Sequence, residues 1–495
     1  MKLLGLRPLG GLGTLFMSLF IFAETTMAGL YIIGEQGGDF STATYAITFF
    51  ALGNLCSLPL GDRFNHKKLF QWFAPLFLFT TILASFMPTY FLYNFMRFLQ
   101  GVTSGPFFVV IPSLLLSFAT SEERNAYIRN ILVCTMSSAT IGGAIGGAIA
   151  YEFHWQWILL FDLIGYLPFY LLFLYEIRPL QVESPKKRFD MAGYLLYLFN
   201  ISAFVIFFTM GQQLDWFRSG FLRSIALISA VTIPLFILYE QKHPYPLLDF
   251  HILRKKNVLF ALFNMTILFG TFYGVNAMLS IWLHVYIEYS VSYIAIMMAV
   301  MTFAIIFVFI IASHPKYNKN LTTLFIGVSL ITASSIFSMF FSADVNFGRI
   351  VLARTIEGVG QALFLPPLYH ILLDDLDQKD VLGGIALYQI ARSLGSGLGP
   401  AIIVQVWERR AAFYHSRLGG DLTQFSVLTR ETLRKMIPFR LSEDQRIAEL
   451  NHALTSQVQT LAINDTFFLI ASILSILLIM IPFFAYNQRK RAEII

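Results

Sequence analysis

The sequence is poor in charged residues and in cysteine. Only 13% of its 495 residues are charged, whereas soluble domains carry about 25%. Hydrophobic residues make up 56% of the chain and include 51 Phe, so most of the chain is predicted to lie in a membrane. Its two cysteines, Cys56 and Cys134, both fall inside apolar runs and fit no disulfide or metal pattern.

Further absences limit the function. The chain has no G-x-x-x-x-G-K-[ST] loop, so ATP is not expected to drive its activity. The run GSGLGP at 395–400 is not a dinucleotide loop, because no strand is expected before it. The net charge of +6 lies in short segments between apolar runs, which sets membrane topology rather than a nucleic-acid surface. We therefore expect no enzyme, no cofactor or metal, and no nucleic-acid partner.

Apolar runs long enough to cross a bilayer, about 20 residues each, recur along the whole chain. We expect fourteen helical spans and both termini on one side of the membrane. The expected spans lie near residues 11–33, 43–61, 69–88, 90–117, 129–151, 157–176, 191–211, 219–239, 257–283, 290–313, 321–341, 349–373, 383–407 and 465–486.

The distribution of Lys and Arg predicts the orientation. With a cytoplasmic N-terminus, the short outside segments hold only Arg218, Arg223 and Arg349, while the inside segments hold 21 basic residues. The exception is the segment 408–464, which would lie outside and mixes basic with acidic residues. Long segments are translocated largely regardless of charge, and we interpret this one as one or two amphipathic helices.

One expected span carries an arginine well inside its apolar run. The stretch RFLQGVTSGPFFVVIP begins at Arg97, and Gly101 and Gly105 follow at four-residue steps. These residues share one helical stripe, charged at one end and then small enough for another backbone to approach. Arginine at the centre of a membrane helix costs about 2.5–3.5 kcal/mol on insertion scales. A snorkelling Arg on a tightly packed helix is the alternative interpretation.

A second stretch repeats this pattern. RTIEGVGQALFLPP begins at Arg354, has Gly358 at the same four-residue step, and has Glu357 at the position of Gln100. Internal repeats of this kind are typical of secondary transporters, whose substrate site lies between the two halves.

Other ionisable residues fall inside expected spans. Glu24 is about twelve residues into the first span, near the bilayer midplane at about 1.5 Å per residue. Arg392 also lies within a span, as does Asp162, whose depth the sequence does not fix. Ionisable groups at such depth indicate function, although a structural ion pair with an arginine is an alternative for Glu24. Glu24 and Arg97 have similar depths on antiparallel spans, so we expect them to lie close together.

The first hairpin loop carries a recognisable motif. The segment LPLGDRFNHKKLF at 58–70 resembles the signature loop of the major facilitator superfamily, with matches at Asp62, Arg63, Lys67 and Lys68. An acid and bases at helix ends can form a breakable latch between helices. Simple retention of basic residues in the cytoplasm is the alternative.

Later motifs narrow the resemblance. TIGGAIGGAIAYEFHWQW at 140–157 resembles the fifth-helix motif of the fourteen-span drug:proton antiporters (EmrB/QacA type), with Gly143 in place of the usual Pro. The segments GQQLDW at 211–216, YPLLDFHILRKKN at 245–257 and ARSLGSGLGP at 391–400 resemble further parts of that family. The glycines expected to permit close helix packing are Gly101, Gly105, Gly142, Gly146, Gly147, Gly358, Gly395 and Gly399.

The resemblance implies an all-α major facilitator fold with 14 transmembrane helices. Two six-helix bundles, 1–177 and 257–495, would flank two extra helices in 178–256. The implied function is proton-coupled export of amphiphilic drugs or other small toxic molecules, cationic ones among them. The implied location is a bacterial inner membrane, with both termini cytoplasmic. A transporter dedicated to one metabolite, such as a siderophore, and a non-transporting receptor or scaffold are the alternatives. The retained intramembrane charges argue against a scaffold.

The resemblance also implies site residues and a partner. The expected proton-coupling and transport residues are Glu24, Arg97, Gln100, Asp162, Arg354, Glu357 and Arg392. Glu24 stands where the family usually has Asp. A periplasmic adaptor of the membrane-fusion type is expected to dock partly on 408–464, unless this segment forms a self-packed cap.

Overall fold

The computed structural model describes residues 9–38, 42–61, 63–120, 123–179, 189–312, 320–377, 380–420, 422–423, 425–436 and 442–492. Within these residues every long regular element is a helix. The helices are α1 (Leu9–Ala23), α2 (Thr25–Gln36), α3 (Tyr45–Ser57), η2 (Leu58–Leu60), α4 (His66–Ser85), α5 (Tyr90–Ser104), α6 (Phe107–Phe118), α7 (Arg124–Glu152), α8 (Gln156–Ile177), α9 (Met191–Met210), η3 (Trp216–Arg218), α10 (Gly220–Lys242), α11 (Phe250–Leu253), α12 (Lys256–Ile281), η4 (Trp282–Tyr286), α13 (Val291–Ala312), α14 (Leu321–Ser338), α15 (Phe347–Asp374), α16 (Val381–Gly419), α17 (Val427–Lys435) and α18 (Glu443–Ala492).

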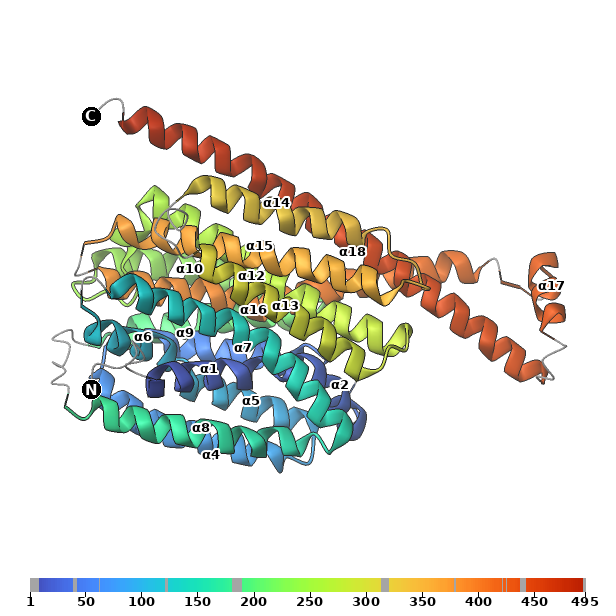
Figure 1. Ribbon diagram of the computed structural model, residues 1–495, viewed down its shortest axis with the longest axis horizontal. Helices are drawn as coiled ribbons and strands as arrows, with labels where there is room; N and C mark the ends of the chain where they lie inside the picture. The colour runs from blue at the N-terminus through green and yellow to red at the C-terminus, as the bar shows by residue number, and fades with distance from the viewer. Residues whose placement is uncertain are drawn as a thin grey trace.

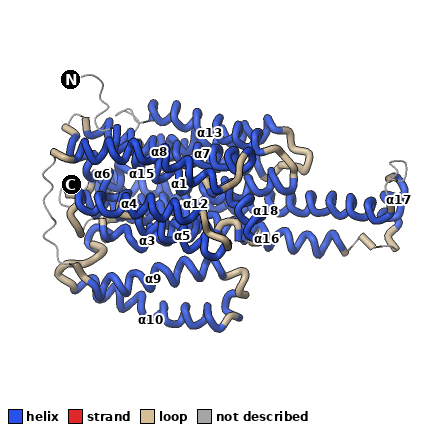
Figure 2. Tube along the Cα trace, turned by 90° about the horizontal axis from the view of Figure 1, so that it is seen from below, coloured by secondary structure: helices blue, strands red, loops and turns tan. Residues whose placement is uncertain are grey.

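The long helices lie side by side in one bundle. Helix α1 begins and α18 ends at the same end of this bundle, while α16, α17 and α18 project well beyond the other end (Figure 1). Ends on the same side are what an even number of membrane crossings requires. Helices α9 and α10 lie at the periphery (Figure 2), where α9 packs on α3 and α16, and α10 packs on α9.

Ten helices in the described part of the chain are long and apolar enough to cross a membrane, or eleven if the bent pair α1–α2 counts as one span. Each of the fourteen ranges expected from the sequence contains a helix, but fourteen crossings are not confirmed. The apolar stretch Tyr45–Leu60 is shorter than the others. Helices α15 and α16 are not among the ten, and they carry the buried charged residues Arg354, Glu357 and Arg392.

The two halves of the chain repeat one packing pattern. In the first half α1 packs on α7, α3 on α5, and α4 on α8. In the second half α12 packs on α16, α13 on α15, and α14 on α18. The repeat seen in the Arg97 and Arg354 stretches therefore extends to the pairing of whole helices. Parallel repeats of this kind are found in transporters that rock one half against the other.

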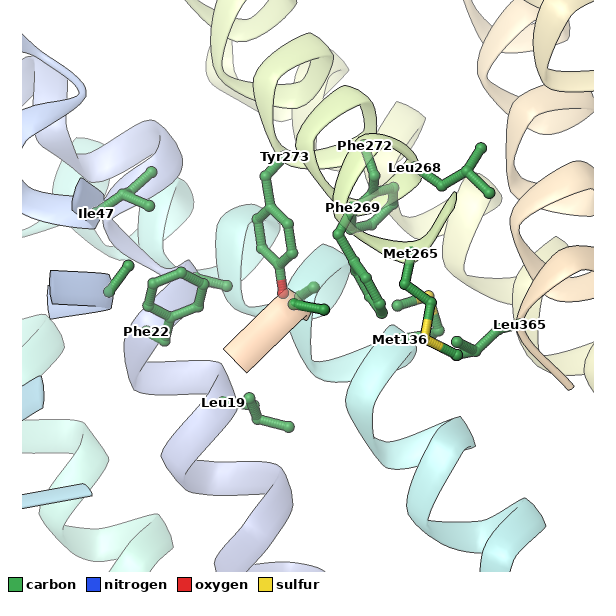
Figure 3. Packing of buried hydrophobic residues seen from close by; sticks show 14 of the residues in the cluster. Leu19, Phe22, Ile47, Met136, Met265, Leu268, Phe269, Phe272, Tyr273 and Leu365 are labelled. Atoms are coloured by element: carbon green, nitrogen blue, oxygen red, sulfur yellow. The ribbon is translucent and has the colours of Figure 1, made fainter. Parts of the chain in front are cut away.

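The apolar core continues across the boundary between the halves. Leu19 and Phe22 of α1 and Met136 of α7 face Phe269 and Tyr273 of α12 in one cluster (Figure 3). The rings of Phe22 and Tyr273 lie 5.4 Å apart. The halves thus meet through aromatic side chains at this level, and these side chains must separate if the halves move apart.

Glycines set the closest helix contacts. A Cβ on Gly101 of α5 would overlap the carbonyl oxygen of Phe50 in α3, and a Cβ on Gly53 would overlap that of Phe98. The pair formed by Gly399 of α16 and Gly270 of α12 is asymmetric. A Cβ on Gly399 would overlap the backbone of Gly270, whereas a Cβ on Gly270 would meet no atom closer than 3.5 Å.

This asymmetry gives a matched pair of variants. We expect Gly399→Ala to destabilise the protein by about 1–3 kcal/mol, as overpacking against a rigid backbone does. Gly270→Ala should leave the stability unchanged or slightly higher, because alanine is favoured over glycine inside helices by about 0.5–1 kcal/mol. Thermal unfolding of both variants in the same detergent, followed by tryptophan fluorescence, checks this. Equal shifts in the unfolding temperature of the two variants would contradict this asymmetric packing.

Candidate functional site

The first expected span is broken at Glu24. Helix α1 ends at Ala23 and α2 begins at Thr25. The axis of Leu9–Ala23 differs by 49° from that of Ala28–Gln36. Gly146 of α7 packs directly on this break, since a Cβ there would lie 2.6 Å from the carbonyl oxygen of Glu24 and 2.8 Å from its Cβ. The Glu24 side chain is fully buried. The glycine motif of α7 therefore holds the acid in place through backbone contact.

Arg97 of α5 reaches this break from the neighbouring helix. Its Nη1 lies 3.6 Å from Oε1 of Glu24 and donates a hydrogen bond of 2.9 Å to Oε1 of Gln100. Its Nη2 donates to the carbonyls of Ile21 and Phe22, on the α1 side of the break, at 3.0 and 3.2 Å. The arginine thus both faces the acid and satisfies backbone acceptors where the helix is interrupted.

Several side chains orient Arg97. Gln100 is fixed by a hydrogen bond of 3.1 Å from its Nε2 to the hydroxyl of Thr81 in α4. The guanidinium carbon lies 4.7 Å from the centre of the Phe50 ring, a cation–π distance. Nη2 also donates to the hydroxyl of Thr25 at 3.2 Å. Arg97 and Gln100 are both fully buried.

Asp162 of α8 completes this cluster. It is 2% exposed and lies within electrostatic reach of both Glu24 and Arg97. The Glu24 and Asp162 carboxyl groups lie within hydrogen-bonding reach of each other, and no other group among the described residues donates to either oxygen of Glu24 or to Asp162 Oδ2. Two carboxyl groups therefore face one guanidinium in a buried setting. Such a group is electrically neutral only when one of the two acids holds a proton.

The second repeat builds a related but balanced site. Arg354 forms an ion pair with Glu357, three residues on in α15, as Arg97 bonds Gln100 three residues on in α5. Arg354 also donates to Oδ1 of Asn276 in α12 at 2.7 Å and to Sδ of Met301 in α13 at 3.4 Å. One acid and one arginine meet here, so this site needs no added proton for neutrality.

Arg392 lies apart from both clusters. Its Nε donates to Oε1 of Gln389 at 2.8 Å, and its guanidinium carbon lies 4.7 Å from the centre of the Phe108 ring. Gln389 in turn donates to the carbonyl of Phe108 at 2.9 Å. Since α16 and α6 belong to different halves, these contacts cross the boundary between them. No carboxylate among the described residues pairs with Arg392.

The residues expected to form a latch are placed differently from one another. Arg63 donates to the carbonyls of Pro246 and Leu247, which link α10 to α11. The ammonium of Lys67 donates to the carbonyl of Arg178 at 2.8 Å, while Lys68 is exposed. Asp62 lies outside the described residues, so the ion-pair latch stays a prediction. In the described part of the chain, the loop between η2 and α4 therefore binds the segment that joins α10 to α11.

The remaining motif glycines all lie in helix contacts or buried positions. Cβ atoms on these residues would approach Ser57 and Asn54 (Gly105), Phe20 (Gly142), Met301 (Gly358) and Thr266 (Gly395). Gly147 is buried in α7.

Sequence reasoning missed the polar partners. Thr81, Asn276 and Gln389 each bond a buried side chain of the site, but no sequence motif marks them. Gln389 could have been found, because Gln and Arg stand three residues apart in both halves. Gln100 follows Arg97 by three residues, and Gln389 precedes Arg392 by three.

Comparison with known protein families matches residues 10–400 to the Major Facilitator Superfamily. The chain belongs to the major facilitator superfamily. It is accordingly a multi-pass membrane transporter of small molecules and not an enzyme.

Relatives cover nearly the whole chain. The fatty acid resistance protein FarB of Neisseria gonorrhoeae is 26% identical over 486 residues, which is 95% of each chain. The multidrug export protein EmrB of Escherichia coli K12 is 22% identical over 494 residues, or 96% of each chain. The superfamily resemblance and its EmrB-type branch, expected from the motifs, are confirmed.

Solved structures share the fold at low sequence identity. A bacterial homologue of the human lysosomal transporter Spinster, in an inward-facing and occupied conformation, aligns with a TM-score of 0.59 at 12% identity over 96% of each chain. The human organic anion transporter MFSD10 aligns with a TM-score of 0.58 at 11% identity, covering 94% of this chain and 97% of the other. The expected all-α major facilitator fold is confirmed.

The contacts of Arg97 predict a graded effect of its replacement. Arg97→Ala should lower both stability and transport, because two buried carboxyls lose this cation. Among the described residues Arg97 is the cation that pairs with Glu24, and removing one partner of a buried pair costs about 3–5 kcal/mol. Arg97→Lys should keep more activity, since it retains the charge, but a single ammonium cannot reach Gln100 and the α1 carbonyls together. Thermal unfolding and transport by purified protein in liposomes measure both effects.

Two further variants separate charge from geometry. Arg97→Gln combined with Glu24→Gln should recover stability relative to Arg97→Ala without recovering transport. Arg223→Gln, on the exposed face of α10, is the control and should behave as the parent. Full transport by Arg97→Ala would show that the cluster is not part of the transport machinery.

Proposed function

We propose that this transporter exports amphiphilic small molecules in exchange for protons. The support for the substrate class is the kinship with proteins named for multidrug export and fatty acid resistance. The observation that supports proton coupling is the cluster of Glu24, Asp162 and Arg97, in which two buried acids face one arginine. The 49° break at Glu24 places this acid where the first span can change shape.

The charge of the cluster explains how a proton would be gained and lost. Burial favours the neutral form of a carboxyl group, while a nearby arginine favours the charged form. Water entering from one side stabilises the state with both acids ionised. Closure removes that water and favours the state in which the two acids share one proton. Alternating access would therefore load the proton from one side and release it on the other.

The bundles that move are proposed to be 1–177 and 257–495, with 178–256 supplying the peripheral pair α9 and α10. The cross-boundary contacts between Phe22 and Tyr273 and between Gln389 and Phe108 are among those that would break. In the proposed orientation both termini face the cytoplasm of a bacterium and the transporter lies in its inner membrane. The projection formed by α16, α17 and α18 then lies outside.

Amide variants of the acids test the proton site. Glu24→Gln and Asp162→Asn each leave one acid facing Arg97. In neither variant should the Arg97 cluster hold an exchangeable proton at the working pH. Both variants should fail at uphill transport in liposomes under an imposed pH gradient. Both should still exchange labelled for unlabelled substrate without a gradient, because that reaction needs no proton movement. Glu24→Asp should keep partial uphill transport.

The matched control for this experiment is Glu35→Gln. This acid lies in α2 near the end of the bundle, where it accepts a hydrogen bond from Trp155, and its replacement should leave proton coupling intact. If Glu24→Gln transports uphill as well as the parent does, Glu24 is structural. Glu357 would then be the next candidate.

We also propose that a periplasmic adaptor docks on the projecting hairpin, defined as 408–464. The shaft is held together by Arg410 of α16, whose guanidinium pairs with Asp465 of α18. The tip presents apolar side chains to solvent, with Phe425, Val427 and Leu428 at 87%, 63% and 75% exposure. Exposed apolar groups at the end of a rigid arm are typical of a contact surface.

Serine substitutions at the tip test this docking. The triple change Phe425→Ser, Val427→Ser and Leu428→Ser should abolish capture of the cognate adaptor from membranes. Transport by the purified variant in liposomes should stay normal, because these side chains pack on nothing in the bundle. Ile447→Ser, on the shaft of the same hairpin, is the control. Adaptor capture that survives the triple change unaltered would place docking elsewhere.

A further inference from the structure

Among the described residues, three arginines are buried within long helices, and their charges are not compensated equally. Arg97 faces two carboxyl groups and Arg354 faces one. Arg392 is 1% exposed and has no carboxylate partner in the described part of the chain. Its contacts include the amide oxygen of Gln389, the ring of Phe108 and the hydroxyl of Tyr273, while its Nη2 has no hydrogen-bond acceptor among the described residues. A buried charge without a counterion is unusual, because removal from water penalises the charged form strongly.

The position of Arg392 points to a role in binding. It lies eleven residues after the start of α16 at Val381, about 17 Å along the helix axis and therefore near the middle of a hydrocarbon core of about 30 Å. It also lies at the boundary between the halves, where the substrate sites of such repeat transporters are found. The unpartnered Nη2 of Arg392 is thus buried near mid-membrane depth, at the boundary between the halves, where a transported molecule would pass.

The internal repeat shows that packing does not require this arginine. Gly395 of α16 packs on the backbone of α12 as Gly142 of α7 packs on the backbone of α1. Three residues before Gly395 is Arg392, and three residues before Gly142 is Ala139. The two halves therefore share the glycine contact, but only the second half places a charge beside it.

The surroundings of Arg392 suit an amphiphile. Tyr273 and Tyr388 lie within electrostatic reach of the guanidinium, and the hydroxyl of Tyr388 has no hydrogen-bond partner among the described residues. Beyond Tyr273 lies the aromatic cluster shared by both halves, with Phe22 at 5.4 Å and Phe272 at 5.1 Å between ring centres (Figure 3). A cation and hydroxyl donors thus border an apolar layer that would open when the halves separate.

We infer that Arg392 binds the anionic head of the transported amphiphile, a carboxylate or a similar monoanion, while the aromatic layer takes its apolar tail. This inference rests on the proposed export function and specifies its substrate class. A carboxylate oxygen would accept a charge-assisted hydrogen bond from the unpartnered Nη2 of Arg392. Tyr388 adds a neutral donor. A cationic head would be repelled here, so cationic amphiphiles are poor substrates.

Equilibrium binding to purified protein in nanodiscs, with no gradient, tests this assignment. The probes share a twelve-carbon chain and differ in head group: dodecanoate, dodecan-1-ol and dodecyltrimethylammonium. The parent should bind dodecanoate at least about tenfold more tightly than either other probe, as expected for a charge-assisted pair. Arg392→Gln should weaken dodecanoate binding by about tenfold or more and leave dodecan-1-ol binding unchanged. Arg392→Lys should give an intermediate affinity for dodecanoate.

The controls keep the outcome decisive. Arg223→Gln on α10 should bind all three probes as the parent does. The comparison of head groups on the parent needs no variant, so it stands even if Arg392→Gln does not fold. Equal affinity of the parent for all three probes, tighter binding of the cation, or unchanged dodecanoate binding by folded Arg392→Gln would each overturn the inference.

Glu24→Gln separates this inference from the proposed function. That variant should bind dodecanoate as the parent does while failing at uphill transport. If it transports uphill but the head-group preference holds, the proton site is wrong and the anion site stands. If uphill transport fails as proposed but the parent shows no preference for the carboxylate, the anion site is wrong and proton coupling stands.

Discussion

The dominant physical constraint in this transporter is the compensation of charge inside a low-dielectric bundle. A charge buried there is tolerated only when a counterion, aligned dipoles or water offset its desolvation. Arg97 meets this condition with a carboxylate, an amide, a ring face and two backbone carbonyls. The same contacts explain the broken first span, because the guanidinium satisfies carbonyls on the α1 side of the break. Structure and chemistry therefore depend on one side chain.

The internal repeat supplies a common frame on which the two halves differ in charge. Glycines on α7 and α16 bring α1 and α12 into close contact in the same way, and an arginine on α5 or α15 bonds the residue three positions on. Among these buried residues, the first half has two acids and one arginine, and the second half has one acid and two arginines. A buried cluster with two acids and one arginine, and a buried arginine without a carboxylate partner among the described residues, thus lie in different halves.

The sequence predicted the helices and the repeat because both follow from local patterns. Apolar runs of sufficient length and Arg–Gly steps of four residues are visible without a structure, and matching depths on antiparallel spans placed Glu24 beside Arg97. The break at Glu24 was not predictable, since no proline marks it and its contacts come from Arg97 and Gly146, on helices distant in the sequence. The isolation of Arg392 was also invisible, because the absence of a counterion is a property of packing across the whole bundle.

Separating the proton from the anion changes how transport can be driven. Under this assignment the two ligands do not compete for one side chain, so coupling passes through the alternation of the halves. Exchange of one outgoing monoanion for one incoming proton moves the equivalent of two positive charges inward, each worth about 2.3 kcal/mol per 100 mV. The same exchange with a cationic substrate moves none. The uncompensated charge of Arg392 on α16 therefore decides whether the membrane potential contributes to export.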